Sequence, residues 1–396
     1  MKLHCSTYMS LVPHQKGEEH SLVSIGLYAK GLDEAANLTE RNSGPGQDYG
    51  FQPEKYPIAW QLADLEQQVT AFLAIKKPKT PLRETLWVFS FGTWDIWSLA
   101  SLPLNISRPV VQRMTDHIYE QAERLYQSAL DPESIAWSGL PTEEGKNSTA
   151  RRTGMFRILI PKLLDPSLMP GWTSARPELA KVHSKAEQMR NAYILTGEWN
   201  AHLTTKLSVW VNGSGPKYVE DAKPSGENGN LAESLKATVG PTEYFEDVIA
   251  ALQAAAAAGG SQTKRRSAVA EGPLRDGFLF DLPEYLLSAM ADGQLRNLGL
   301  AEGDGVGASP PGEGYGDVSI PCAGESGHGE ARFTSGIWPT KMCEVAQDYL
   351  FWTPFTVAPR AIREIGMLAA DMVRRNDTMR ALWDAVRWEP GKKSST

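Results

Sequence analysis

The sequence predicts an α/β fold in which a parallel sheet is flanked by helices. Apolar runs of strand length occur at residues 86–91, 156–161 and 277–281. Between and around them lie longer segments whose apolar residues recur every three or four positions, which is the spacing of a helix with one buried face. Strands that alternate with helices in this way are typical of a parallel sheet.

Each element is predicted from its local pattern. Residues 86–91 are almost wholly apolar, so we interpret them as the central strand, covered on both faces. Residues 21–28 are interpreted as a strand that turns at Gly26, and residues 349–352 as a last short strand. Helices are predicted at residues 59–75, 109–130, 180–210, 242–258, from the end of the 277–281 strand through Met290, and at 359–375.

Length and composition favour one elaborated domain. The chain has 396 residues, of which 41% are apolar, which is enough for one large core or two smaller ones. We expect a single domain over residues 1–396. Within it, residues 212–271 are rich in Gly, Ser, Lys, Glu and Ala and predict a flexible insert, and residues 376–396 predict a C-terminal tail.

Charge and hydropathy exclude two classes of partner. The formal net charge is −7, and the only dense basic run is residues 264–266, so a nucleic-acid-binding surface is not expected. No apolar run reaches the roughly 18–20 residues of a membrane span. The N-terminal residues lack the apolar core and cleavage pattern of a signal peptide.

The cysteines and asparagines bear on the compartment. Cys5, Cys322 and Cys343 are too few for a zinc cluster, and no set of His, Cys, Asp and Glu has ligand spacing, so neither a metal nor a cofactor is predicted. One bridge, between Cys322 and Cys343, is allowed. Five of the eleven asparagines head Asn-x-Ser/Thr triplets, where chance gives roughly one or two. They are Asn37, Asn105, Asn147, Asn212 and Asn376. The triplets favour a secreted glycoprotein, although the absent signal pattern leaves the localisation open.

A candidate binding wall follows the first apolar strand. Gly92, Thr93, Trp94 and Asp95 come directly after it. In open α/β sheets the ligand crevice lies at the carboxyl ends of the strands, so these four residues are predicted to bind a small molecule. The alternative is structural: Gly92 permits a turn, Asp95 caps the next helix and Trp94 fills the core.

Several short motifs, each weak alone, occur in a fixed order along the chain. They are Asp64-Leu65 with Gln67 and Gln68, Gly92–Asp95, Phe156–Pro161 with Pro166 and Pro170, Asn191 in a helix, Phe280-Asp281 with Leu286-Leu287, Gly299 and Pro321-Cys322, and Cys343 followed by Tyr349–Trp352. In this order they resemble motifs of the GDSL-type (SGNH) esterase/lipase family, particularly its fungal and plant-like members. The resemblance covers most of residues 3–375 outside the insert. It implies a three-layer α/β/α sandwich around a parallel, flavodoxin-like sheet.

The family's catalytic residues do not carry over. Its members use a serine in a Gly-Asp-Ser turn, a histidine base, an orienting aspartate and an asparagine in the oxyanion hole. This chain contains no strand-Gly-Asp-Ser-helix unit. Trp94 stands at the asparagine position, Thr353 at the aspartate and Thr356 at the histidine. Because threonine is not a general base near pH 7, the resemblance implies a protein of esterase ancestry that is catalytically depleted.

Three functions therefore remain open from the sequence. The first is a depleted esterase-like protein that keeps a cleft for an ester or glycan-like ligand. The second is an active ester hydrolase whose Gly-Asp-Ser block lies upstream of this chain, with His183, His202 or His328 as base. The third is a non-catalytic interaction module that exposes some of its 12 tryptophans, although most of these fall on predicted core faces.

Overall fold

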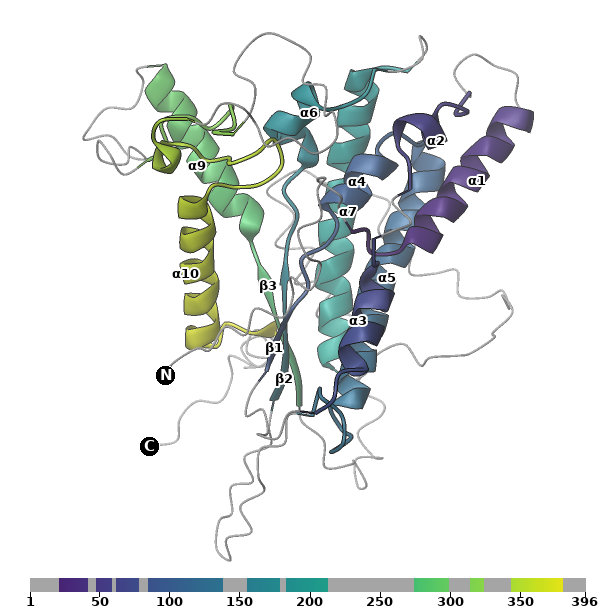
Figure 1. Ribbon diagram of the computed structural model, residues 1–396, viewed down its shortest axis with the longest axis vertical. Coiled ribbons are helices and arrows are strands. Elements are labelled where there is room, and N and C mark those ends of the chain that lie inside the picture. The colour runs from purple at the N-terminus through teal and green to yellow at the C-terminus, as the bar shows by residue number, and fades with distance from the viewer. Residues whose placement is uncertain are drawn as a thin grey trace, which may run out of the picture.

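The computed structural model describes residues 21–41, 48–58, 62–77, 85–137, 155–178, 183–212, 274–298, 314–323 and 343–379. These segments form an α/β fold, as the sequence predicts (Figure 1). The predicted insert lies outside the described residues except for Asn212, as does the helix predicted at 242–258. The predicted tail lies outside them except for residues 376–379.

The sheet has three parallel strands in the order β1-β2-β3. They are β1 (Leu86–Val88), β2 (Met155–Pro161) and β3 (Leu274–Phe280). Ile158 of β2 lies opposite Trp87 of β1 and Gly277 of β3. Parallel neighbours need crossover connections, and the two longest helices lie between consecutive strands in the chain. These are α5 (Leu104–Ser128), between β1 and β2, and α7 (Lys185–Val211), between β2 and β3.

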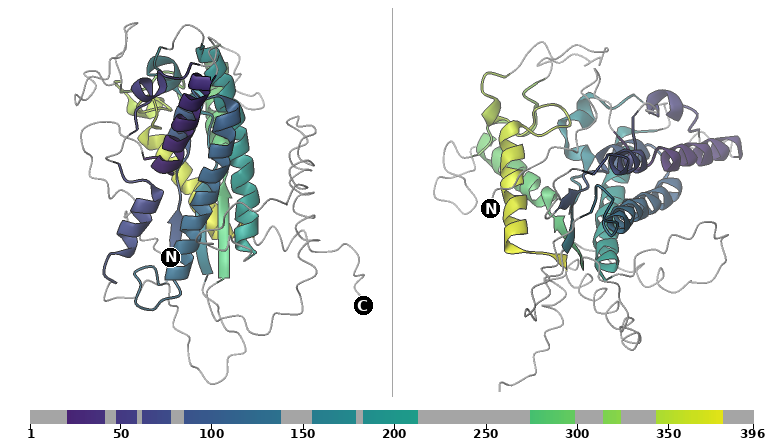
Figure 2. Two further views of the ribbon diagram at one scale, coloured as in Figure 1. Left: turned by 90° about the vertical axis from the view of Figure 1, so that its right-hand side faces the viewer. Right: turned by 60° about the horizontal axis from the view of Figure 1, so that its bottom comes forward.

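Helices lie on both faces of this sheet, as Figures 1 and 2 show from different sides. On one face the ring of Phe156 in β2 lies 6.0 Å from that of Trp210 in α7. On the other face Phe278 of β3 packs in one cluster with Ile365 of α10 (Pro359–Arg375). Because successive strand side chains point to opposite faces, a strand between two helical layers must be apolar at nearly every position, as β2 is.

The prediction that residues 86–91 form the central strand is wrong. The regular strand covers only residues 86–88, and among the described residues β1 pairs with β2 alone, so β2 is the central strand. Leu86 and Val88 are 39% and 37% exposed. Both side chains point to the face of the sheet on which α10 lies. However, α10 packs against β3, which is separated from β1 by β2, so it does not cover these two residues. The almost wholly apolar run therefore has one buried face, which carries Trp87 and Phe89.

The predicted helices that fall in the described segments are present, most of them with shifted ends. α3 (Leu65–Leu73) begins later than predicted, because Asp64 caps it in a reciprocal capping box with Gln67. α5 begins before the predicted residue 109, so Pro109 lies inside the helix. The remaining helices are α2 (Gln52–Lys55), α4 (Thr93–Leu99), η2 (Pro166–Leu168), α6 (Pro170–Ser174), α9 (Leu282–Asn297) and η4 (Ala346–Asp348).

The predicted strand at residues 21–28 is wrong, because residues 21–24 form no regular strand and α1 (Ile25–Arg41) takes the second half of the segment. Tyr28, Leu32 and Ala35 are all buried and follow each other at helical spacing. The apolar run before Gly26 thus leads into an amphipathic helix that begins at Ile25. Residues 349–352 are likewise not a regular strand and form only isolated bridges, Asp317 with Tyr349 and Phe351 with Val357.

Candidate functional site

The predicted wall lies at the carboxyl end of β1, where α4 begins. Gly92 precedes the first turn of α4 and has a φ of 116°, a backbone conformation that favours glycine. A Cβ on Gly92 would lie 2.5 Å from Leu163 Cδ1 and 2.5 Å from the indole of Trp199. The backbone conformation and the close approach of α7 therefore both require glycine here.

The four wall residues differ in what they present to a ligand. Gly92 and Asp95 are buried, whereas Thr93 and Trp94 are half-buried. Asp95 is not the N-cap of α4, since Gly92 occupies that position. The side chains of Thr93 and Trp94 are thus the part of the predicted wall that a ligand can contact.

The structure brings Trp94 together with the segment that follows Trp352. The ring of Trp94 lies 4.5 Å from that of Phe355, and Trp97 lies 4.9 Å from the same ring. The amide of Gly171, in α6, donates to the carbonyl of Pro354 at 2.9 Å. Segments more than 250 residues apart in the sequence therefore meet beyond the carboxyl end of β1.

Thr353 and Thr356 close a small turn on themselves. Their hydroxyl oxygens are 2.7 Å apart, and Thr353 Oγ1 accepts the amide hydrogens of Phe355 and Thr356. The turn presents two neutral hydroxyl groups. Neither threonine takes up a proton near pH 7.

A disulfide holds the segment that leads into this turn. Cys322 and Cys343 are bonded, with Cα atoms 4.9 Å apart, which confirms the one bridge that the sequence allows. The amide of Cys322 donates to the Phe351 carbonyl at 3.0 Å, and the amide of Ala323 donates to that of Trp352 at 2.8 Å. The bridge therefore fixes the backbone immediately before Thr353.

Asp95 ties the wall to the start of α1. Its side chain is 0% exposed, and Oδ1 accepts the amide hydrogen of Val23 at 2.9 Å. Oδ2 has no hydrogen-bond partner among the described residues. Burial disfavours the ionised carboxylate and raises the pKa of Asp95 to about 7, against the smaller opposing effect of the backbone hydrogen bonds.

This burial predicts a pH-dependent stability. The folded-state pKa of Asp95 lies above the unfolded value of about 3.9. The stabilisation of the folded state by the protonated Asp95 carboxyl is therefore complete below about pH 4 and is lost as the pH rises through 7. We expect the free energy of unfolding to fall by about 2–3 kcal/mol from pH 5 to pH 8 because of this group. Urea unfolding of wild type and Asp95→Asn across that range gives the free energy of unfolding of each protein as a function of pH. The contribution of Asp95 is the difference between the slopes of these two curves.

The matched control is Asp33→Asn, at an exposed position of α1. It should keep the wild-type pH dependence, whereas Asp95→Asn should lose the part described above. Parallel curves for wild type and Asp95→Asn would show that the Asp95 carboxyl titrates as it does in the unfolded chain.

The other end of α4 is held by buried polar side chains. Arg176 is 4% exposed and donates to the Trp97 carbonyl at 3.0 Å. Asn191 of α7 donates to the carbonyls of Ala100 and Leu102 at 3.2 and 3.3 Å. The last carbonyls of a helix lack partners within the helix and carry partial negative charge, so a cation and an amide are suitable partners.

Sequence reasoning missed Arg176 and Phe355. The guanidinium of Arg176 lies 3.8 Å from the ring centre of Trp172 and 4.6 Å from that of Trp97. An arginine in a polar segment is usually predicted to be a surface residue. Only the tertiary fold shows that aromatic rings surround Arg176. Phe355 lies in a short segment between Thr353 and Thr356, and no local pattern there indicates that its ring packs against other aromatic rings. A Cβ on Gly171 would collide with the Phe355 ring.

The two described candidate bases, His183 and His202, have neighbours on other segments than the threonine turn. The ring of His183 lies 4.9 Å from that of Tyr49. Burial lowers the pKa of His202, which lies on α7 near Asp116 of α5. His328 lies outside the described residues. The hydrogen bonds of the Thr353 hydroxyl go to residues 355 and 356 instead.

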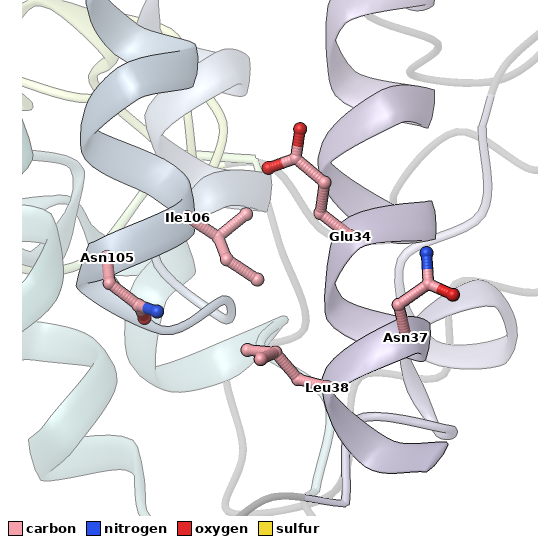
Figure 3. A pocket seen from close by; sticks show the side chains of 5 residues that line it. All are labelled: Glu34, Asn37, Leu38, Asn105 and Ile106. Carbon is pink, nitrogen blue, oxygen red and sulfur yellow. The ribbon is translucent and has the colours of Figure 1, made fainter. Parts of the chain in front are cut away.

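A surface hollow of about 330 Å³ lies elsewhere, between α1 and α5 (Figure 3). Its lining consists of Glu34, Asn37, Leu38, Asn105 and Ile106. These residues include one carboxylate and no nucleophile or base–nucleophile pair. The lining therefore offers no hydrolytic chemistry, although amides, a carboxylate and apolar side chains can contact a sugar.

The described segments offer no site for a metal ion and no helix for a membrane. They contain no cluster of three or more His, Cys, Asp or Glu residues that could hold a metal ion. No helix among them combines the length and the apolar character that crossing a membrane requires. No protein-family model, curated protein or solved structure matches this chain.

Proposed function

We propose that this chain is a catalytically depleted protein of SGNH-hydrolase ancestry, with the three-layer sandwich of that family. It binds a small ester or glycan-like ligand at the carboxyl edge of its sheet without hydrolysing it. One observation carries the proposal. Phe355 packs on Trp94 and so brings the segment after β1 against the turn of Thr353 and Thr356. The resemblance aligns Trp94, Thr353 and Thr356 with the family's asparagine, aspartate and histidine.

The chemistry of this edge supports binding rather than acyl transfer. Hydrolysis by this route needs a nucleophile, a base that accepts its proton and an oxyanion hole. Two threonine hydroxyls that bond to each other supply no base, and an indole ring replaces the amide. Half-buried aromatic rings such as Trp94 and Phe355 instead provide apolar surface against which an acyl chain or a sugar ring can pack.

The first test is ester hydrolysis. We expect the purified chain to release no more phenol from a short-chain aryl ester than heat-inactivated protein does. A serine-directed phosphonate should add no mass to the folded protein. Ester turnover that the phosphonate abolishes would show that the chain is an active serine hydrolase.

The second test is binding. Titration with a short-chain aryl ester and with an acetylated oligosaccharide should change the tryptophan fluorescence for at least one of them. The change should be lost in Trp94→Ala. It should persist in Trp137→Ala, a half-buried tryptophan whose contact is with Lys77. A titration that leaves wild-type fluorescence unchanged with both probes contradicts a ligand site at this edge.

A working hydrolase is the second candidate, and the edge of the sheet favours it. β1 pairs only with β2 among the described residues, and Leu86 and Val88 are partly exposed. A further strand that ends in a Gly-Asp-Ser turn would pair with β1 and bring a serine near Trp94. A chain extended by such a strand should then hydrolyse the aryl ester, and the same chain with that serine changed to alanine should not.

A further inference from the structure

Among the asparagines with described side chains, those that head Asn-x-Ser/Thr triplets are exposed and those outside triplets are buried or half-buried. Four of the five that head Asn-x-Ser/Thr triplets lie in the described segments, and all four are exposed: Asn37, Asn105, Asn212 and Asn376. Two asparagines outside triplets also have described side chains. Asn191 is 3% exposed, and half-buried Asn200 bonds both backbone groups of Leu163. Among the asparagines with described side chains, those in triplets are thus the ones exposed enough to carry a bulky group.

The disulfide gives an independent indication of the compartment. Cys322 and Cys343 are bonded in the folded chain. Structural disulfides form in oxidising compartments such as the lumen of the endoplasmic reticulum, where asparagine triplets are also glycosylated. Both features therefore indicate passage through the secretory pathway.

Two of the exposed acceptors border one hollow. Asn37 projects from α1 and Asn105 from the first turn of α5, on the two helices that flank it (Figure 3). The hollow measures about 330 Å³, within the range of about 300–1,000 Å³ that small-ligand pockets occupy. Leu38 and Ile106 supply its apolar lining and Glu34 a carboxylate. This mixture suits a sugar, which has an apolar ring face and hydroxyl groups.

We propose that Asn37 and Asn105 are both N-glycosylated and that their glycans cover the hollow between α1 and α5. The oligosaccharide comes from a lipid-linked pyrophosphate donor and is transferred by the enzyme of the host's secretory pathway. Nδ2 of each asparagine forms a bond to C1 of the first sugar and loses one proton. The bond between C1 and the pyrophosphate oxygen breaks, and the lipid pyrophosphate leaves. No oxidant is needed.

The test is expression of the full chain behind a cleavable export signal in a eukaryotic host. Peptide mapping after N-glycosidase release in heavy-oxygen water should find label at both Asn37 and Asn105. Asn37→Gln and Asn105→Gln should each lose one glycan from the intact mass. Asn42→Gln, which changes an asparagine in an Asn-Ser-Gly sequence, should lose none. An unlabelled Asn37 or Asn105 peptide, from cells that glycosylate a co-expressed reference protein, overturns the proposal.

Hydrogen exchange tests whether the glycans cover the hollow. Enzymatic removal of the glycans from the folded protein should speed amide exchange and side-chain labelling around residues 34–38 and 104–107. Exchange around Asp281, at the end of β3, should not change. Unchanged labelling at both lining segments overturns the covering of the hollow.

Discussion

Replacing Gly92 with alanine is expected to lower the free energy of unfolding by about 3–5 kcal/mol. The φ of 116° at this position is strained for any residue with a Cβ. The added methyl group would also lie 2.5 Å from Leu163 and Trp199, so α7 or the loop after β2 must move. Urea unfolding monitored by circular dichroism measures the loss.

Gly197→Ala is the matched control for this substitution. Gly197 is an exposed position of α7, and a Cβ there meets nothing within 4 Å. Because alanine restricts the unfolded chain and favours helix, we expect a gain of about 0.4–1 kcal/mol. Equal effects of the two substitutions would mean that the conformation at Gly92 is not the one described.

Replacing Arg176 with methionine is expected to cost about 2–4 kcal/mol. Methionine keeps much of the apolar packing, but it leaves the Trp97 carbonyl and the Gln188 side-chain oxygen without the donor that Arg176 supplies. It also removes the cation that lies over the rings of Trp97 and Trp172. Thermal unfolding of the variant measures the cost.

Arg190→Met separates this effect from the loss of any arginine. Arg190 is exposed on α7, so its replacement should change the free energy of unfolding by no more than about 0.5 kcal/mol. The Arg176 variant should also weaken ligand binding at Trp94, because the C-terminal end of α4 loses an anchor. A variant as stable as wild type would contradict the buried contacts of Arg176.

Much of the secondary structure follows from the local pattern. Residues 359–375 have the spacing of an amphipathic helix behind a proline, and α10 spans those residues. The strand predicted at residues 156–161 corresponds to β2, which begins one residue earlier. In these segments the periodicity of burial and the local turn chemistry point to the same element, so tertiary context had little to change.

The segments whose secondary structure was predicted wrongly are short apolar runs that are compatible with more than one structural environment. Residues 21–28 are compatible either with a strand or with a segment that leads into the first turn of α1 at Ile25. Residues 86–91 suit either a central strand or an edge strand with one uncovered face, and the position of α10 over β3 decides between them. Periodicity over six to eight residues does not contain that information.

For the candidate site, the sequence by itself determined that a glycine, a tryptophan and an aspartate follow a strand and that threonines stand near the end of the chain. It also determined that Cys322 and Cys343 are available to pair. Only the tertiary structure decided that Phe355 packs against Trp94, that Asp95 is buried against Val23 and that Arg176 lies among aromatic rings. These contacts join residues far apart in the sequence, and burial of a side chain is a property of all the elements around it rather than of its neighbours in the chain.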